Sequence, residues 1–325
     1  MHPLLRYGLA AFFSIALICQ PYARTSQQAG GAATQSDKQQ LPGRLSNQTY
    51  RANVDLINVY VSAWNKDTRS FVTNLAREDF AVFEDGKKQE ITNFAREANL
   101  PLTIALLVDT SQSVAPKLKF EQEAATNFFY TVLRESDRAM LVEFDSAVSL
   151  VQDLTNNTNR LAKQIGSLQA AGNTALYDAI VRTCDEKLIR DPGRKAMVIL
   201  SDGDDSASVE TFDRAREMAL IAEATIFSIS INRGGFFGVG GDTRNGDKVL
   251  KQLATETGGE AYSPFQVEEL DNSFREISQE LRSQYNIGYI SSNPLRDGSY
   301  RKIEVKVGER SLNLKYRKGY FAPGK

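Results

Sequence analysis

The sequence predicts an α/β fold in which an open, mostly parallel sheet lies between two layers of helices and is inserted into a small antiparallel β-sandwich. Three observations lead to this prediction. Residues 98–285 alternate apolar runs with helical patterns, which is typical of a parallel sheet covered on both faces. Residues 50–97 and 286–325 instead repeat with a period of two, as half-buried strands do. Each of these two segments is too short to hold a core alone, so we expect them to close one β domain.

The β segments contain recognisable strands and one turn. Ile57, Val59 and Val61 fall at alternate positions and would share one face of a strand. Asp85-Gly86 lies between two short apolar runs and is a strong signal for a two-residue hairpin turn. The last segment adds three strand patterns, YNIGYIS, YRKIEVKV and SLNLKYR. We predict one sandwich of about five to seven strands, with two separate small β modules as the alternative.

The middle segment alternates strands and helices along the chain. The apolar run LTIALLVD, residues 102–109, predicts a strand covered on both faces. The further elements expected, in chain order, are a helix at 117–134, a strand pair at 139–154, helices at 159–168 and 174–189, a buried strand at 195–203, a helix at 211–223, a strand at 224–232, and helices at 248–257 and 267–281.

The first residues indicate export. Arg6 precedes an apolar stretch, Gly8–Cys19, that is short for a membrane span but suits the apolar region of a signal peptide. We interpret residues 1–23 as a cleaved signal peptide, with an uncleaved membrane anchor as the alternative. Residues 24–49 are rich in Gln, Ser, Gly and Ala and predict a disordered linker. The mature protein is therefore expected to be secreted, or to reside in the periplasm or cell envelope.

Composition excludes several functional classes. The chain has 39 basic and 40 acidic residues, which gives no long-range attraction to nucleic acid. Its only histidine, His2, leaves with the signal peptide, so Ser-His-Asp catalysis and imidazole zinc sites are excluded. Cys184 lies on the apolar side of its predicted helix, and we expect a buried core thiol rather than a nucleophile. We therefore expect no enzymatic activity.

Oxygen-bearing side chains follow two of the apolar strands. Asp109, Ser111 and Ser113 stand at alternate positions where one strand ends, and Asp202 follows another. Open α/β sheets bind ligands at such carboxyl ends. Two carboxylates about 4 Å apart would repel by roughly 4 kcal/mol at an effective dielectric constant near 20, which a hard divalent cation turns into attraction. Helix capping by Asp and Ser is the alternative interpretation.

Three motifs in this order resemble one known family. Asp109–Ser113 (DTSQS), AGNTALYDA at 171–179 and ILSDGDD at 199–205 are similar to the metal-ion-dependent adhesion site of the von Willebrand factor type A domain, a Rossmann-like fold. The departures are Gln112 and Ala171, each in place of a usual glycine, and neither removes a ligand. The resemblance implies a bound divalent cation, Mg²⁺ before Mn²⁺ or Ca²⁺. It also implies these metal ligands: Asp109, Ser111, Ser113, Thr174 and Asp202.

The resemblance extends over about residues 50–323 to the bacterial secreted VWFA-related proteins common in Acidobacteria. It implies that the cation accepts an Asp or Glu side chain of a partner protein. We therefore expect an exported protein that binds partner proteins through this metal, without binding nucleic acid and with membrane contact only through an uncleaved anchor. The alternative is a structural envelope scaffold in which the ion only stabilises the domain.

Some neighbouring residues are expected to have other roles. Asp204 and Asp205 are interpreted as loop or capping residues, and Asp178 as a brace for the Thr174 loop. The glycine-rich segment 232–247 contains two adjacent phenylalanines, Phe236 and Phe237. It is either a connector whose phenylalanines pack back onto the body or a mobile apolar wall beside the ion.

Overall fold

The computed structural model describes residues 55–96, 100–231, 244–264, 267–308 and 312–324. Residues Asn53–Lys325 form one compact unit. The predicted signal peptide, at 1–23, and the predicted linker, at 24–49, lie outside the described residues.

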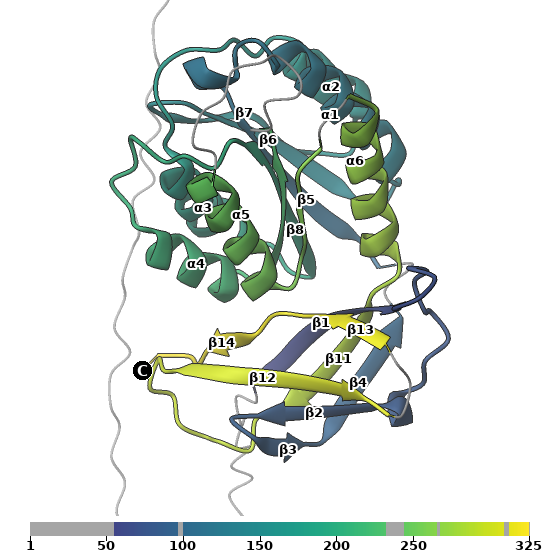
Figure 1. Ribbon diagram of the computed structural model, residues 1–325. Helices are drawn as coiled ribbons and strands as arrows, with labels where there is room; N and C mark the ends of the chain where they lie inside the picture. Colours follow the sequence, from purple (N-terminus) through teal and green to yellow (C-terminus); the bar gives the residue numbers. More distant parts are fainter. Residues whose placement is uncertain (1–54, 97–99, 232–243, 265–266, 309–311, 325) are drawn as a thin grey trace, which may run out of the picture. The chain divides into compact units, whose positions relative to one another are not determined.

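A mixed sheet of six strands, counted over the described ranges, forms the centre of the α/β part (Figure 1). All neighbouring strands are parallel except the last pair, β6 and β7. The spatial order is β10 (Ala261–Tyr262), β9 (Ala224–Ser230), β8 (Arg194–Ser201), β5 (Leu102–Asp109), β6 (Arg138–Phe144) and β7 (Val148–Thr155). The predicted fold class is confirmed.

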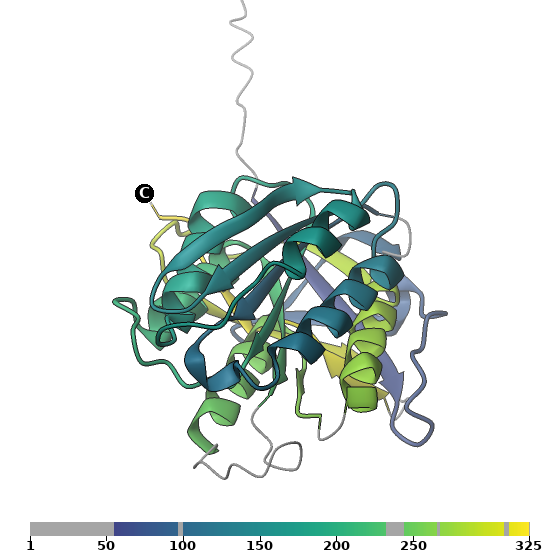
Figure 2. The same ribbon diagram turned by 90° about the horizontal axis from the view of Figure 1, so that it is seen from above.

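Helices cover both faces of this sheet, as the view from above also shows (Figure 2). Successive side chains of β5 point to opposite faces, so Ile104 and Leu106 pack into one core and Ala105 and Leu107 into the other. The first core is closed by α1 (Leu118–Val132), α2 (Thr158–Ile165) and α6 (Val267–Arg282). The second is closed by α3 (Leu176–Thr183), with the π-helical turn Cys184–Leu188 that continues it, α4 (Phe212–Ile221) and α5 (Arg244–Thr257).

The two ends of the chain build two antiparallel sheets that enclose a third core. One sheet has the order β13 (Leu312–Lys315), β1 (Leu56–Asn65), β11 (Tyr285–Ile290) and β4 (Ile91–Arg96). The other has the order β14 (Gly319–Phe321), β12 (Tyr300–Val307), β2 (Phe80–Glu84) and β3 (Lys87–Gln89). Both sheets combine strands from the two chain segments, because β1 pairs with β11 and β2 with β12. The domain limits predicted above, 50–97 with 286–325 against 98–285, stay a prediction.

Local details agree with the sequence in two places and differ in two. Asp85 and Gly86 have φ angles of 47° and 81°, which the predicted two-residue turn requires. Cys184 is fully buried, and burial raises the pKa of its thiol to about 12, as befits a core residue. The sandwich has eight strands in the described ranges, more than predicted, because residues 87–96 divide into two strands and Gly319–Phe321 adds another. Helix α5 begins at Arg244, four residues earlier than predicted.

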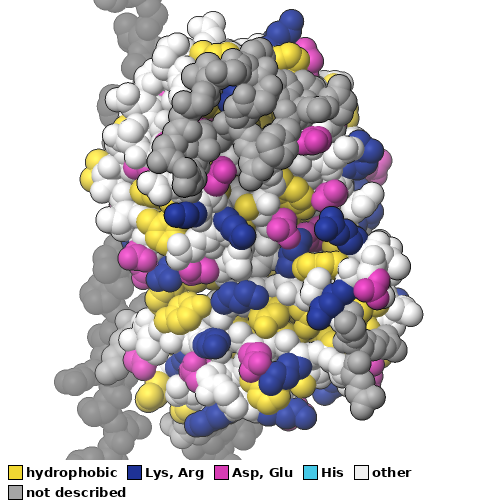
Figure 3. Space-filling view, in the orientation of Figure 1, with side chains coloured by type: hydrophobic (Ala, Val, Ile, Leu, Met, Phe, Trp, Pro, Cys, Tyr) yellow, Lys and Arg dark blue, Asp and Glu magenta, His cyan; other side chains and the backbone are white. Residues whose placement is uncertain are grey.

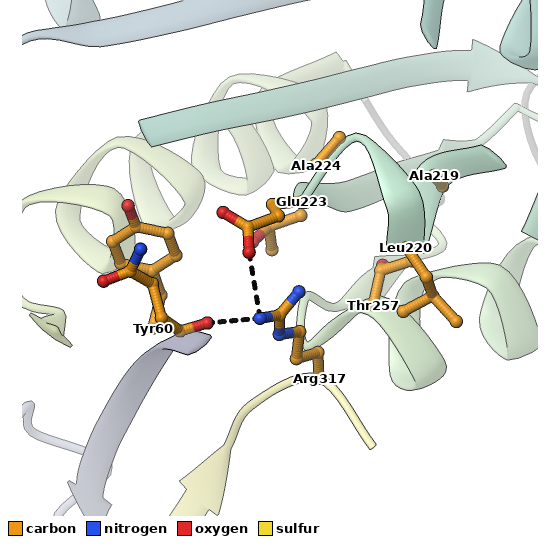
Figure 4. Close-up of a pocket in the computed structure, with 9 residues that line it drawn as sticks. Tyr60, Ala219, Leu220, Glu223, Ala224, Thr257 and Arg317 are labelled. Atoms are coloured by element: carbon orange, nitrogen blue, oxygen red, sulfur yellow. Dashed lines mark hydrogen bonds and ion pairs between the residues drawn. The ribbon is translucent and has the colours of Figure 1, made fainter. Parts of the chain in front are cut away.

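The β strands and the α/β part contact each other through charged side chains. Arg317, which follows β13, donates to the backbone carbonyl of Asn58 at 2.6 Å and to Glu223 at 3.1 Å (Figure 4). The backbone amide of Lys318 donates to the carbonyl of Glu256 at 2.9 Å. On the face drawn in Figure 3, Lys and Arg side chains are interspersed with Asp and Glu. The contact between the two parts therefore depends on compensated charge as well as on backbone hydrogen bonds.

Candidate metal centre

The fold brings the ends of the two critical strands together. Strands β5 and β8 are parallel neighbours, with Val108 opposite Leu200. The chain runs from β5 to β6 on one side and later to β8 on the other, so the strand order reverses at this pair. Asp109 ends β5 and Asp202 follows β8, both buried. This edge is where an open α/β sheet binds its ligands.

Hydrogen bonds link four of the five predicted ligands into one cluster. The hydroxyl oxygens of Ser111 and Ser113 lie 3.0 Å apart, and the Ser113 hydroxyl donates to Asp202 Oδ2 at 2.8 Å. Asp109 Oδ1 accepts from the Ser111 amide at 2.9 Å, and its Oδ2 accepts from the Ser201 hydroxyl at 2.6 Å. The structure therefore brings together side chains that are up to 93 positions apart in the sequence, at Asp109 and Asp202.

Thr174 is attached to this cluster through its loop. The Gln112 amide donates to the carbonyl of Gly172 at 3.0 Å, and the Ala171 amide donates to the carbonyl of Thr110 at 2.7 Å. Thr174 itself is buried, and its carbonyl accepts from the amide of Ser206 at 2.9 Å. Among the described residues, no hydrogen bond joins its hydroxyl to the other four side chains. Backbone hydrogen bonds therefore attach the loop that carries Thr174 to the segment Thr110–Gln112.

The oxygen spacing suits a hard divalent cation. An octahedral ion with ligands at about 2.0–2.1 Å separates adjacent ligand oxygens by about 2.9 Å. The separations of 3.0 Å between Ser111 and Ser113 and 2.8 Å between Ser113 and Asp202 are hydrogen-bond distances and are also compatible with that spacing. Carboxylate and hydroxyl oxygens are the donors that Mg²⁺, Mn²⁺ and Ca²⁺ prefer. The residues fit such an ion by their donor chemistry, and their spacing is compatible with it.

Two buried carboxyl groups near this edge have raised pKa values. Burial raises the pKa of Asp109 to about 6, against the effect of its hydrogen bonds with Ser201 and Ser111. Glu121 on α1 is 1% exposed, and neither of its carboxylate oxygens has a hydrogen-bond partner. Burial, with a contribution from the charge of Asp109, holds the pKa of Glu121 well above its usual range. An added cation would lower the cost of ionising both groups.

Sequence reasoning missed Ser201 and Glu121. Ser201 positions Asp109 by its hydroxyl and also accepts from the amide of Gly203 at 2.9 Å. The sequence feature that could have indicated this role is the position of Ser201, directly before Asp202 at the end of a buried strand. Glu121 lies on the buried face of α1 with Leu118 and Ala125. The sequence feature that could have indicated the burial of Glu121 is an acidic residue at an apolar position of the helical repeat.

The neighbouring acidic residues have supporting roles. Asp205 Oδ1 accepts from the amide of Tyr177 at 3.3 Å and so caps the start of α3. Asp178 Oδ1 accepts from the amide of Glu210 at 2.8 Å, so it braces the loop after β8 rather than the Thr174 loop. Within the described ranges, no three His, Cys, Asp or Glu side chains are grouped to hold a metal, since the candidate centre combines two carboxylates with hydroxyls.

The glycine-rich segment can be assessed only at its end. Phe236 and Phe237 lie outside the described residues, and both interpretations of them stay open. Residues 244–247 are part of α5, so the predicted connector is shorter than 232–247. In this first turn, a Cβ on Gly246 would lie 2.2 Å from the backbone oxygen of Asp202. The start of α5 therefore packs directly against the candidate metal centre.

Comparison with known proteins identifies the domain. The sequence pattern of the von Willebrand factor type A domain family matches residues 104–205, which include all five predicted ligands. The chain contains a von Willebrand factor type A domain. No curated protein matches the chain significantly. The narrower likeness to secreted Acidobacterial proteins stays a prediction.

Several solved structures are similar to part of the chain. An aerotolerance-related membrane protein from Bacteroides fragilis is 14% identical, covers 55% of this chain and 98% of its own, and has a TM-score of 0.46. The type V pili tip protein Mfa5 from Porphyromonas gingivalis is 13% identical, with coverages of 55% and 94% and a TM-score of 0.45.

Proximal thread matrix protein 1 from the mussel byssus, solved with a zinc-occupied MIDAS motif, is 12% identical. It covers 62% of this chain and 50% of its own, with a TM-score of 0.49. Identities and scores this low carry no inference about ligand or partner. As for membrane segments, no helix in the described part of the chain is long and apolar enough to cross a bilayer.

Proposed function

We propose that the protein binds partner proteins through a divalent cation held by Asp109, Ser111, Ser113, Thr174 and Asp202. The observation that carries this proposal is the line of oxygens from Ser111 through Ser113 to Asp202, spaced at 3.0 and 2.8 Å beside the buried Asp109. The cation, Mg²⁺ before Mn²⁺ or Ca²⁺, would balance the carboxylates and accept one further oxygen ligand from outside.

The chemistry of this chain favours an acidic side chain as that outside ligand. Two carboxylates and three neutral hydroxyls leave a divalent ion with positive character. Charge-assisted contacts of a carboxylate with such a centre are much stronger than exposed ion pairs. The chain's residues would hold and orient the ion, and Ser201 would fix Asp109 through its hydrogen bond of 2.6 Å. We expect no catalysis, because the mature chain lacks histidine as a general base.

The place of action follows from the N-terminal sequence. The apolar stretch Gly8–Cys19 supports export, and the spacer 24–49 would separate the folded body from a membrane or cleavage site. The partner would then be another envelope or extracellular protein that presents Asp or Glu. The β-sandwich would serve as a stalk or as a second contact surface.

The test begins with the metal itself. Titration calorimetry of MgCl₂ or MnCl₂ into chelator-treated protein should show one binding site, which Asp202→Ala removes. The exposed Asp213→Asn variant is the matched control, since its side chain is 81% exposed and is not one of the proposed ligands. Circular dichroism checks that each variant keeps its fold. Absence of cation binding to the wild type would exclude the proposal.

The second step tests the partner. Wild type and Asp202→Ala are used to capture proteins from the envelope fraction of the source organism, with Mg²⁺ or with EDTA. An adhesive site requires a captured protein that is lost with EDTA, restored by Mg²⁺ and absent with Asp202→Ala. A structural scaffold instead requires that EDTA lowers the melting temperature while capture persists.

A further inference from the structure

A cavity of about 840 Å³ opens where α6 and β10 face β1 and β13. None of the five proposed metal ligands lines it. Its size lies at the upper end of the range in which proteins hold drug-sized ligands. The cavity is therefore a second candidate binding site, separate from the metal centre and independent of the proposed function.

One part of the cavity lining is tied together by a single lysine. The ammonium group of Lys315 lies 2.5 Å from Glu260 Oε2 and 2.8 Å from Glu280 Oε2. The same nitrogen lies 4.6 Å from the centre of the Trp64 ring, a cation–π contact. These four side chains hold one another in place, so this part of the lining is preformed, with one lysine between two glutamates.

The walls carry charges that the protein leaves uncompensated. The wall formed by the turn after β1 carries Lys66 and Arg69, and the wall formed by α6 carries Glu276. All three are exposed, and within the described residues none of them forms an ion pair. Trp64 and Phe71, which are joined by a β-bridge and half-buried, supply aromatic surface in the same cavity. The cavity thus offers positive charge, negative charge and aromatic surface together.

We infer that this cavity binds a short peptide with free termini, its ammonium group at Glu276 and its carboxylate at Lys66 and Arg69. A central apolar side chain would lie against Trp64 and Phe71. A lining that carries charges of both signs suits a zwitterion better than a ligand of one charge. A volume of about 840 Å³ exceeds the size of a single amino acid and suits a peptide of about three residues.

Both charged ends of the ligand are needed for useful affinity. Exposed ion pairs are individually weak, and each lining charge here is exposed. Loss of one end should therefore weaken binding about fivefold, and neither end alone should suffice. This requirement separates a zwitterionic peptide site from a general aromatic or acidic surface.

The chain provides its own probe for a test. Trp64 is its only tryptophan, so fluorescence excited at the tryptophan band reports on this cavity alone. The tripeptide Ala-Leu-Ala, which is not fluorescent, is titrated into the full chain in the presence of EDTA. We expect a saturable change in Trp64 emission. Leucine alone, and the tripeptide blocked by N-acetylation and C-amidation, should bind at least fivefold more weakly.

Variants assign the response to the two walls. Glu276→Gln and the double variant Lys66→Gln/Arg69→Gln should each weaken binding at least fivefold, whereas Glu90→Gln, an exposed change away from the cavity, should not. A missing response in the wild type would overturn the inference. So would equal binding of the blocked peptide, no effect of either wall variant, or a response to glucose without one to the peptide.

Discussion

The candidate metal centre and the junction with the β-sandwich both bury carboxylates, but they compensate the negative charge in different ways. At the junction the chain supplies its own cations, since Lys315 serves Glu260 and Glu280. At the centre, Asp109 is held by the hydroxyl of Ser201 and a backbone amide, and no basic side chain among the described residues hydrogen-bonds to it. The difference indicates that the junction has a cation of its own beside its buried carboxylate, whereas the candidate metal centre requires positive charge from outside.

The largest expected effect is the pH dependence of the metal-free protein. The pKa of Asp109 is raised from about 3.8 to about 6, so the folded state keeps its proton over a range in which the unfolded state has lost it. The free energy of unfolding should therefore fall as pH rises from about 4 to about 6, by about 3 kcal/mol, and stay reduced above that. Glu121 should act in the same direction.

Urea unfolding at several pH values, with EDTA present, measures this. Asp109→Asn isolates the contribution of one group and should flatten most of the decline. Added Mg²⁺ should restore stability to the wild type above pH 6 but not to the variant. If the free energy of unfolding of Asp109→Asn depended on pH as in the wild type, the charge at this position would already be compensated. The contrast drawn between the metal centre and the junction would then be wrong.

Cation affinity should respond nearly as strongly. Asp109→Asn removes a negative charge while keeping the size of the side chain, so the affinity for Mg²⁺ should fall about 10- to 100-fold. Titration calorimetry at pH 7 is the measurement. A variant that binds the cation like the wild type would mean that Asp109 is a packing residue rather than part of the centre.

At the junction, removing a cation should damage the fold but not metal binding. Arg317→Ala leaves Glu223 and the carbonyl of Asn58 without their partner, and we expect a loss of about 2 kcal/mol in the free energy of unfolding, reduced because Glu223 is partly exposed. Glu186→Gln, which breaks an exposed pair with Arg182, should cost less than about 0.5 kcal/mol. Chemical denaturation compares the two, and equal losses would contradict a special role for buried charge at the junction.

The smallest effect concerns the support of the centre by α5. A Cβ on Gly246 would meet the backbone oxygen of Asp202 at 2.2 Å and Asp204 Oδ1 at 2.9 Å. Gly246→Ala should therefore displace Asp202 and weaken cation binding about tenfold by calorimetry, although Ala in a helix is favoured over Gly by about 1 kcal/mol. Gly308→Ala, where nothing lies within 4 Å, is the control and should bind normally.

The sequence predicted the convergence of Asp109 and Asp202 because parallel strands end at one edge of a sheet. That rule is local and general, and it needs only the apolar runs and the residues that follow them. The burial of Glu121 could not be predicted by this rule, because an acidic residue in a helix is usually solvated. Its burial depends on how α1 packs. The short strand Gly319–Phe321 was not predicted because three residues are too few to show a periodic pattern.

The cavity beside Trp64 could not have been predicted in the same way. Its walls come from residues that are more than 190 positions apart, such as Lys66 and Glu276. Their approach depends on the packing of α6 against the sheets and on the pairing of β1 with β13, neither of which is encoded in a local pattern. Long-range packing, rather than motif, determines this site.

The burial of Cys184 gives the molecule a natural reporter of opening. Its thiol is fully enclosed beside α3 and has a pKa near 12, so alkylating reagents reach it only when this helical layer separates from the sheet. The rate of labelling would then measure how often this helical layer opens, without any engineered probe. If a ligand bound at the candidate metal centre slowed the labelling of Cys184, binding at the carboxyl ends of the strands would be shown to stabilise the helical layer that covers this thiol.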